Sequence, residues 1–246
     1  MSFGWRLNVP VMAQRLGTDL GTDTSQSPWN MSATELLCPL ARFFYTACLP
    51  LTLIFSPVVV TADSQSEVAL WFESGMAVAS SQLSGRREIP LGAQEVVISS
   101  GTNGINGIVV TSRRLLGFSS RALTWSKKEL NVNEKVFERT ILPTFSLIRT
   151  DRHLYGFRGV NGLWLAEALG VREKVNRFHS NDYGAVFITK ERLVGFTPLL
   201  GGFASKPLDV HERIVGVEND NGLILVSTTK RTLVFGSRLS GWEEFE

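Results

Sequence analysis

Cysteine and histidine are scarce in this chain of 246 residues. Its two cysteines, Cys38 and Cys48, lie in the N-terminal third, and its three histidines are spread over the rest of the chain. This distribution excludes a disulfide framework, a cysteine-based zinc site and a cysteine nucleophile from every residue after Cys48.

Net charge is also small. The formal charge is +2, while 43% of the residues are hydrophobic and 20% are charged. These proportions are typical of a globular protein and exclude a largely disordered chain. A net charge this close to zero does not indicate nucleic-acid binding, so none is expected, and any electrostatic recognition must depend on where charges cluster.

Enzyme signatures are missing too. The chain has no Gly-x-Ser-x-Gly elbow and no phosphate-binding glycine-rich loop. A glycoside hydrolase needs two separated carboxylates of unlike environment, and nothing in the pattern selects Glu73, Asp151 or Asp182 for that role. We therefore predict a non-catalytic protein without cofactor or metal, with glycoside hydrolysis as the less favoured alternative.

The N-terminal region contains one long apolar run. Residues 1–35 are polar and without periodicity, and the run Phe43–Val60 follows a single basic residue, Arg42. A positive charge, an apolar segment and a small residue such as Ala62 are the layout of a secretory signal, and an uncleaved membrane anchor is the variant of that interpretation. Either would place the protein in the periplasm, outside the cell or on a membrane.

A structural interpretation of the same run competes with export. Val58 lies 39 residues before Val97, which begins a predicted strand, so the end of the run is also a candidate for the first strand of the repeat described next. A cytoplasmic protein would then be expected. The two alternatives remain open at this point.

What the chain does contain is a phrase that returns every 39 residues, which indicates an internal repeat. It reads TSRRLLGF from Thr111, TDRHLYGF from Thr150, TKERLVGF from Thr189 and TTKRTLVF from Thr228. Residues 52–246 accommodate five such units with nothing left over. We therefore predict a leader at 1–51 and a five-repeat domain at 52–246.

Each unit has room for four short strands and none for a helix. A β-branched apolar run is followed by a charged turn and a second apolar run, which predicts a hairpin. An aromatic position and a glutamate then recur at the same 39-residue spacing. They are Trp125, Trp164, Phe203 and Trp242, and Glu95, Glu134, Glu173 and Glu212.

This pattern resembles β-propeller repeat proteins, in which four antiparallel strands of about 40 residues form one blade. The resemblance implies an all-β, five-bladed β-propeller of four-stranded antiparallel blades after a leader outside the propeller. A β-trefoil has three such units, and the Gly-His and Trp-Asp signatures of the WD family are missing. No narrower family is matched.

The recurrent glutamates and aromatics are predicted to be structural. A carboxylate at the start of a strand accepts hydrogen bonds from free N–H groups, and a bulky side chain in every blade is typical of a wedge between sheets. The alternatives are a shared cation site for the glutamates and sugar stacking for the aromatics. Loops rich in Asn, Asp and Gly, such as 101–106, 179–182 and 218–221, are expected on the edge of the blades opposite the charged hairpin turns.

The hairpin tips carry cations, which predicts a partial basic rim for an anionic partner. Its predicted ligand-binding residues are Arg114, His153, Arg192 and Arg231. Further cations from connections on the same side are Lys127, Lys128, Arg172, Lys174, Lys206 and Arg213. The competing interpretation is that exposed turns are ordinarily charged.

The sequence thus predicts a non-catalytic binding module that presents its rims to a protein or anionic partner. A lectin-like propeller that binds polysaccharide is the alternative. Tethering through Phe43–Val60 is possible on this interpretation, and the sequence does not define an oligomeric state.

Overall fold

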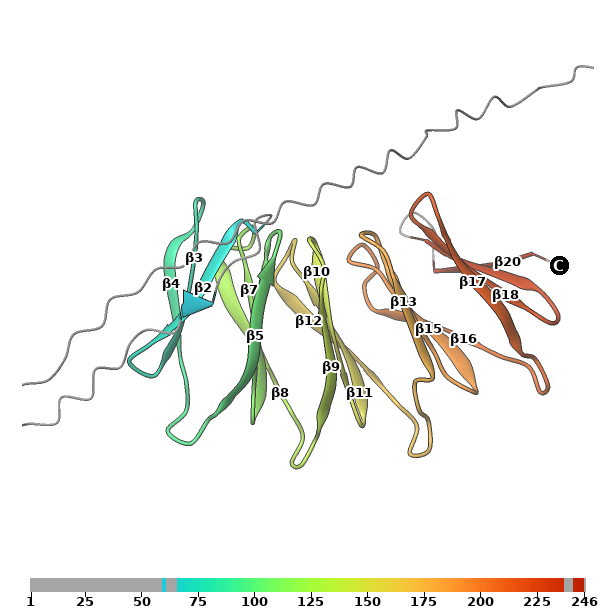
Figure 1. Cartoon of the computed structure of the whole chain (residues 1–246), viewed down its shortest axis with the longest axis horizontal. Helices are drawn as coiled ribbons and strands as arrows, with labels where there is room; N and C mark the ends of the chain where they lie inside the picture. Colours follow the sequence, from blue (N-terminus) through green and yellow to red (C-terminus); the bar gives the residue numbers. More distant parts are fainter. Residues whose placement is uncertain (1–58, 61–65, 237–240, 246) are drawn as a thin grey trace, which may run out of the picture. The chain divides into compact units, whose positions relative to one another are not determined.

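The computed structural model describes residues 59–60, 66–236 and 241–245, and every regular element in these ranges is a β-strand. The strands form five four-stranded sheets, called blades 1 to 5 in chain order (Figure 1). Blade 1 contains β1 (Val59–Val60), β2 (Val68–Glu73), β3 (Met76–Ser81) and β4 (Gly85–Pro90). Blade 2 contains β5 (Val97–Asn103), β6 (Asn106–Thr111), β7 (Arg114–Ser119) and β8 (Thr124–Glu129). Blade 3 contains β9 (Val136–Ile141), β10 (Phe145–Thr150), β11 (His153–Arg158) and β12 (Leu163–Ala168).

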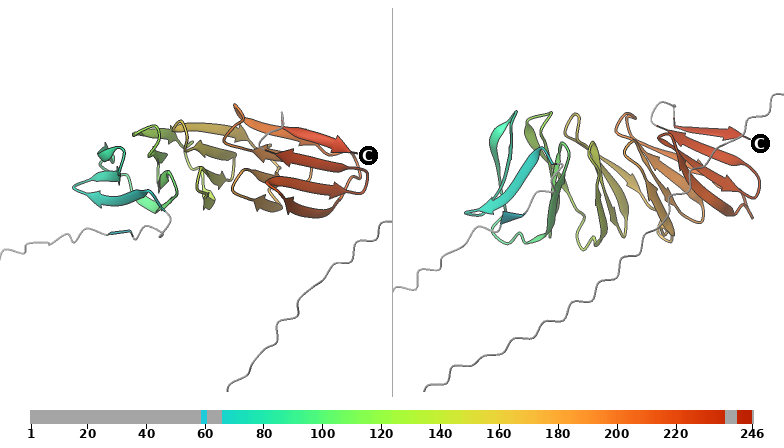
Figure 2. Two further views of the ribbon diagram at one scale, coloured as in Figure 1. Left: turned by 90° about the horizontal axis from the view of Figure 1, so that it is seen from above. Right: turned by 45° about the horizontal axis from the view of Figure 1, so that its top comes forward.

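The last two blades follow the same plan. Blade 4 contains β13 (Arg177–Ser180), β14 (Ala185–Ile188), β15 (Arg192–Phe196) and β16 (Phe203–Pro207). Blade 5 contains β17 (Ile214–Asp220), β18 (Leu223–Thr228), β19 (Thr232–Gly236) and β20 (Trp242–Phe245). Figure 2 (left) shows β17–β20 side by side in one sheet.

In every blade the strands pair in sequence order and antiparallel, as a simple meander. Each recurrent glutamate lies just before the first strand of its blade, and each recurrent aromatic lies in the last strand. The predicted fold class, the strand order within each unit and the resemblance to propeller repeats at the level of fold are therefore confirmed.

The first strand of blade 1 comes from the end of the apolar run. Val59 pairs with Trp71 and Val60 with Leu70, which is the pairing expected if the 39-residue unit extends back to this point. The rest of Phe43–Val60, the leader and the predicted boundary at residue 51 lie outside the described residues. Export therefore stays a prediction.

The core lies between consecutive blades. One cluster joins Leu70 of blade 1 to Leu116 of blade 2, and the next joins Val110 of blade 2 to Tyr155 of blade 3. Because the middle strands are covered on both faces, they contain continuous apolar runs rather than an alternating pattern, and all six residues of β6 are buried. The LLGF phrase is a consequence of this double burial.

The glycine of that phrase allows the next blade to approach closely. A Cβ on Gly156 would clash with the ring of Phe196 in blade 4, and one on Gly195 would clash with the ring of Phe235 in blade 5. Gly117 and Phe157 repeat the contact between blades 2 and 3. The absent side chain is thus replaced by an aromatic ring from the following repeat.

The recurrent aromatics also join neighbouring blades. The indole N–H of Trp242 donates to the carbonyl of Ala204 at 2.8 Å, and that of Trp125 to the carbonyl of Arg87 at 3.1 Å. Both acceptors belong to the last strand of the preceding blade, and Trp164 makes the same contact to Ser126 at 3.4 Å. These half-buried indoles act as wedges with a polar anchor.

Candidate functional site: the tip edge

Two sets of turns lie at the same edge of the blades, which we call the tip edge. The first set is the turns between second and third strands, at 112–113, 151–152, 189–191 and 229–231. The second set is the inter-blade connections, at 91–96, 130–135, 169–176 and 208–213. Backbone hydrogen bonds join them: the N–H of Leu130 donates to Arg113 O at 2.9 Å, and that of Asp151 to Lys135 O at 3.0 Å. In Figure 1 the inter-blade connections lie toward the bottom of the view.

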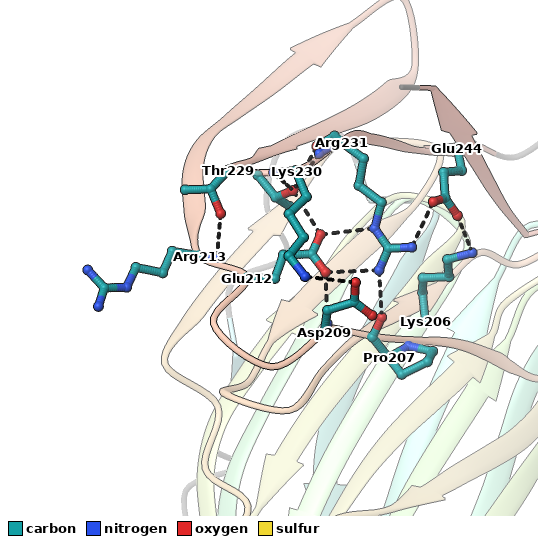
Figure 3. A network of polar contacts seen from close by, with 10 residues as sticks. Lys206, Pro207, Asp209, Glu212, Arg213, Thr229, Lys230, Arg231 and Glu244 are labelled. Atoms are coloured by element: carbon teal, nitrogen blue, oxygen red, sulfur yellow. Dashed lines mark hydrogen bonds and ion pairs between the residues drawn. The ribbon is translucent and has the colours of Figure 1, made fainter.

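A buried carboxylate organises each inter-blade connection from blade 2 onward. In blade 5, Oε2 of Glu212 accepts the N–H of Asp209 at 2.8 Å and so closes the turn (Figure 3). Oε1 accepts the hydroxyl of Thr228 at 2.8 Å, and Arg231 donates to both oxygens. The Glu212 side chain is 0% exposed, so its charge is balanced entirely by these groups.

The same cluster recurs at fixed spacing, with Thr 16 and the cation 19 residues after the glutamate. Arg114 donates to Glu95 from Nε at 2.8 Å and from Nη2 at 2.9 Å. Arg192 donates to Glu173 from Nε at 2.8 Å and from Nη2 at 3.0 Å. Two-point contacts of this kind fix the guanidinium in one orientation.

These arginines also tie each blade to the one before it. Nη2 of Arg114, Arg192 and Arg231 donates to the carbonyls of Pro90, Ala168 and Pro207 respectively, at 2.6, 2.7 and 3.1 Å. Each acceptor ends the last strand of the preceding blade. The arginine thus bridges a carboxylate of its own repeat and a free backbone oxygen of its neighbour.

The pKa values of the glutamates follow from this geometry. Arg231, with help from Asp209 N–H and Thr228, outweighs burial and lowers the pKa of Glu212 to about 2. Burial raises the pKa of Glu95, but Arg114, Gly92 N–H and Thr111 together outweigh it and lower the pKa to about 2. All these side chains are therefore charged at neutral pH.

Blade 3 departs from the pattern because His153 replaces the arginine. Its Nδ1 lies 2.9 Å from Oε1 of Glu134, and the buried Tyr155 hydroxyl donates to the same carboxylate at 3.1 and 3.2 Å. Burial of Glu134 raises its pKa, but Thr150, Asn131 N–H, His153 and Tyr155 together lower it. The tyrosine hydroxyl thus supplies part of what the missing guanidinium supplies elsewhere.

The four tip residues predicted to bind a ligand, Arg114, His153, Arg192 and Arg231, all belong to these clusters. Their side chains are 13–24% exposed and point at carboxylates of the same chain. Blade 1 has Gly75 at the corresponding position, as the sequence indicates. The tip-edge cations that face solvent are others: Arg113, Lys135, Arg152, Arg172, Lys174, Lys190, Arg213 and Lys230.

Sequence reasoning missed a second exposed feature of this edge. Val132, Val171 and Val210 lie at the same place in three successive connections, each two residues before the buried glutamate. Their relative exposures are 82%, 105% and 78%. The signal in the sequence that could have identified these valines was their 39-residue spacing.

The opposite edge is used largely for joining blades. The side-chain amide of Asn106 donates to Leu142 O at 2.7 Å, and that of Asn103 donates to Ile141 O at 3.0 Å, in each case from blade 2 to blade 3. In the 179–182 loop, Asn181 Oδ1 accepts the N–H groups of Tyr183 and Gly184, both at 2.9 Å. Several amides predicted for this edge thus stabilise turns and blade contacts.

The described residues, 59–60, 66–236 and 241–245, contain neither a cluster of metal-ligating side chains nor a membrane-spanning helix. In that part of the chain, no group of three or more His, Cys, Asp or Glu side chains is placed to hold a metal ion. The same residues include no helix long and apolar enough to cross a membrane.

Comparison with known proteins gives similarity at the level of fold. No protein-family model and no curated protein matches the sequence. Among solved structures, the chain is similar to a Saccharomyces cerevisiae complex of Dbp5 with Nup159, Gle1, IP6 and ADP (12% identity, TM-score 0.34) and to BamB from Moraxella catarrhalis (15%, 0.33). It is also similar to PorZ, a surface component of the type-IX secretion system of Porphyromonas gingivalis (9%, 0.36).

These alignments cover 74%, 75% and 75% of this chain, but 59%, 62% and 27% of the respective structures. The chain therefore spans less than two thirds of each. At these identities and TM-scores the similarity supports no inference about activity or partners.

Proposed function

We propose that the chain is a non-catalytic binding module whose tip edge recognises an anionic partner. The observation that carries the proposal is the division of cations at this edge into two sets. Arg114, Arg192 and Arg231 are held by buried glutamates, whereas a second set in the same turns is exposed. The first set joins each blade to the preceding one through backbone carbonyls.

The exposed set has a regular position of its own. Lys135, Lys174 and Arg213 each directly follow a buried glutamate and precede the first strand of a blade. Figure 3 shows the side chain of Arg213 directed away from the Glu212–Arg231 cluster. Three equivalent cations on successive blades favour a partner with repeated negative charge, because several weak, similar contacts add to a useful affinity.

Carbohydrate stacking has less support. Trp125, Trp164 and Trp242 are half-buried, and the indole N–H of each is already bonded to the preceding blade. A sugar platform needs an accessible ring face, so the alternative requires aromatics other than these wedges.

The proposal is tested by measuring the salt concentration at which the full chain elutes from a sulfated-polysaccharide matrix. The triple variant Lys135→Gln/Lys174→Gln/Arg213→Gln is expected to elute at clearly lower salt. The matched control Arg87→Gln/Arg121→Gln/Lys127→Gln removes the same charge from exposed positions outside the tip-edge turns. Lys127, which the sequence assigned to a connection, lies within β8. Equal shifts in both triples, or no retention of the parent chain, would contradict the proposal.

A further inference from the structure

Val132, Val171 and Val210 belong to none of the core clusters formed by the described residues. The turn that carries Val132 is closed by the N–H of Glu134, which donates to Asn131 O at 3.0 Å, and by the N–H of Asn131, which donates to Oε2 of Glu134 at 2.9 Å. The turn that carries Val210 is closed in the same way by Asp209 and Glu212. None of these bonds needs an apolar side chain between the two residues.

Valine is also an unusual residue for such a position. Turns favour Gly, Asn, Asp and Ser, and β-branched residues favour strands. Single exposed apolar residues are ordinary on protein surfaces, but a set at one position of three successive repeats is not accounted for in that way. Only the corresponding residue of the first connection, Ala93, is smaller.

Cations accompany these valines at close range in the sequence. Lys135, Lys174 and Arg213 each lie three residues after a valine and are exposed. The exposed charges in the tip-edge turns are mainly positive. The exposed acids there are Asp151, Glu191 and Asp209, and the exposed cations are the eight named above.

We propose that the tip edge docks on an anionic lipid bilayer, with Val132, Val171 and Val210 inserted among the headgroups and the neighbouring cations on the lipid phosphates. This inference rests on the proposed function, because it names the anionic partner. Shallow insertion of apolar side chains beside Lys and Arg is how peripheral proteins combine apolar burial with attraction to anionic lipid.

The shape of the feature favours a bilayer over an acidic peptide. Peptide-binding sites receive the anchors of the partner in pockets, whereas here the valines themselves protrude, with exposures of 78–105%. A bilayer offers the same apolar and anionic chemistry at every point of a surface. A repeat that presents the same valine and cation in three successive blades matches that uniformity.

The test is co-sedimentation of the full chain with vesicles of phosphatidylcholine alone or mixed equally with phosphatidylglycerol. The variant Val132→Ser/Val171→Ser/Val210→Ser is expected to bind the anionic vesicles at least about tenfold more weakly, because it loses apolar insertion and keeps every charge. The matched control Leu83→Ser/Val160→Ser/Leu199→Ser removes exposed aliphatic side chains from loops at the opposite edge and is expected to bind like the parent chain.

Because the run Phe43–Val60 is a predicted membrane anchor and would itself bind vesicles, a local readout complements sedimentation. In a Cys38→Ser/Cys48→Ser background, an environment-sensitive dye on Val171→Cys is expected to shift to the blue with anionic vesicles, and the same dye on Leu199→Cys is not. Absence of any difference between the two sites would overturn the inference.

The outcomes also separate this inference from the proposed function. If the cation triple weakens vesicle binding but the valine triple does not, lipid insertion is wrong and recognition of an anionic partner stands. If the parent chain is retained on the sulfated matrix but does not bind vesicles, lipid insertion is likewise wrong and recognition of an anionic partner stands. The partner would then be an acidic protein or polymer. Loss of both kinds of binding in the parent chain overturns both.

Discussion

Arg231 donates from Nε to one carboxylate oxygen of Glu212 and from Nη2 to the other, each at 2.9 Å. The pair connects a hairpin turn to the connection that enters the same blade, across 19 residues of sequence. The Glu212 side chain is 0% exposed and the Arg231 side chain 13%. A buried pair of this kind is costly to break on one side, because the remaining charge stays buried without its partner.

The first prediction concerns this pair. Arg231→Met is expected to lower the free energy of unfolding by about 3–5 kcal/mol, since it leaves the Glu212 carboxylate uncompensated. Urea denaturation measures the loss. The neighbouring exposed pair Lys230–Asp209, at 3.1 Å, supplies the control: Lys230→Ala is expected to cost less than about 1 kcal/mol. Equal losses in the two variants would show that the buried pair has no special weight.

The second prediction concerns the tyrosine that is particular to blade 3. Tyr155→Phe removes a hydroxyl that donates to the buried Glu134 carboxylate and is expected to destabilise the protein by about 2 kcal/mol. Tyr183→Phe, at a tyrosine that is 58% exposed, is the control and should leave the denaturation midpoint unchanged. A midpoint for Tyr155→Phe that equals the control value would mean that the other three donors suffice for Glu134.

The third prediction concerns the close approach of blades 3 and 4. Gly156→Ala places a methyl group against the Phe196 ring and is expected to cost about 1–3 kcal/mol, measured by thermal or urea unfolding. Gly216→Ala is the control, because no atom lies within 4 Å of its added Cβ. The double variant Gly156→Ala/Phe196→Leu is expected to lose less unfolding free energy than the sum of the losses in the two single variants. Strict additivity would argue against direct contact.

The fourth prediction concerns acid. The pKa values of Glu95 and Glu212 are about 2 in the folded protein and about 4.5 in the unfolded chain. Between these values the unfolded chain binds protons that the folded protein does not, so the free energy of unfolding is expected to fall as pH is lowered from about 4.5 to about 2. Stability above this window is not limited by these groups.

Urea titrations across that pH range measure the slope. The variant Glu95→Gln/Arg114→Met removes one of the two groups together with its partner, and its curve is expected to be flatter than that of the parent chain. Parallel curves would show that Glu95 does not contribute to the acid sensitivity.

The architecture was predictable because the strands and turns of each repeat are recognisable from residues that are adjacent in the sequence. The Thr111 to Phe118 phrase contains a turn between two apolar runs, and its return at 39 residues fixes the strand order of every blade. Glu95 and Trp125 marked the beginning and the end of a blade correctly, since both types recur at positions where a blade meets its neighbour.

The candidate site was less predictable, because its parts are far apart in sequence. Arg114 at a turn and Glu95 before a strand were interpreted separately, one as a ligand-binding group and the other as a backbone acceptor. Folding of the meander brings them within 2.8 Å. The constant spacing of 19 residues between glutamate and cation was visible in the sequence, but only the antiparallel return of the chain gives it meaning. The exposure of Val132 likewise depends on the turn geometry rather than on residue type.

The contact between a glycine of one blade and a phenylalanine of the next determines which junctions between repeats are equivalent. Gly117, Gly156 and Gly195 each contact the phenylalanine ring of the next repeat. Blades 2, 3 and 4 thus offer the same site, which we call the socket, to the ring of the following blade. The socket is occupied by Val78 in blade 1 and by Val234 in blade 5, and Ala79 stands where later blades carry the ring. Blades 2, 3 and 4 therefore share this contact, whereas blades 1 and 5 lack its glycine. Excision or duplication of one 39-residue module between these blades keeps a glycine opposite every phenylalanine ring, whereas a junction at Val78 or Val234 has no glycine at that position.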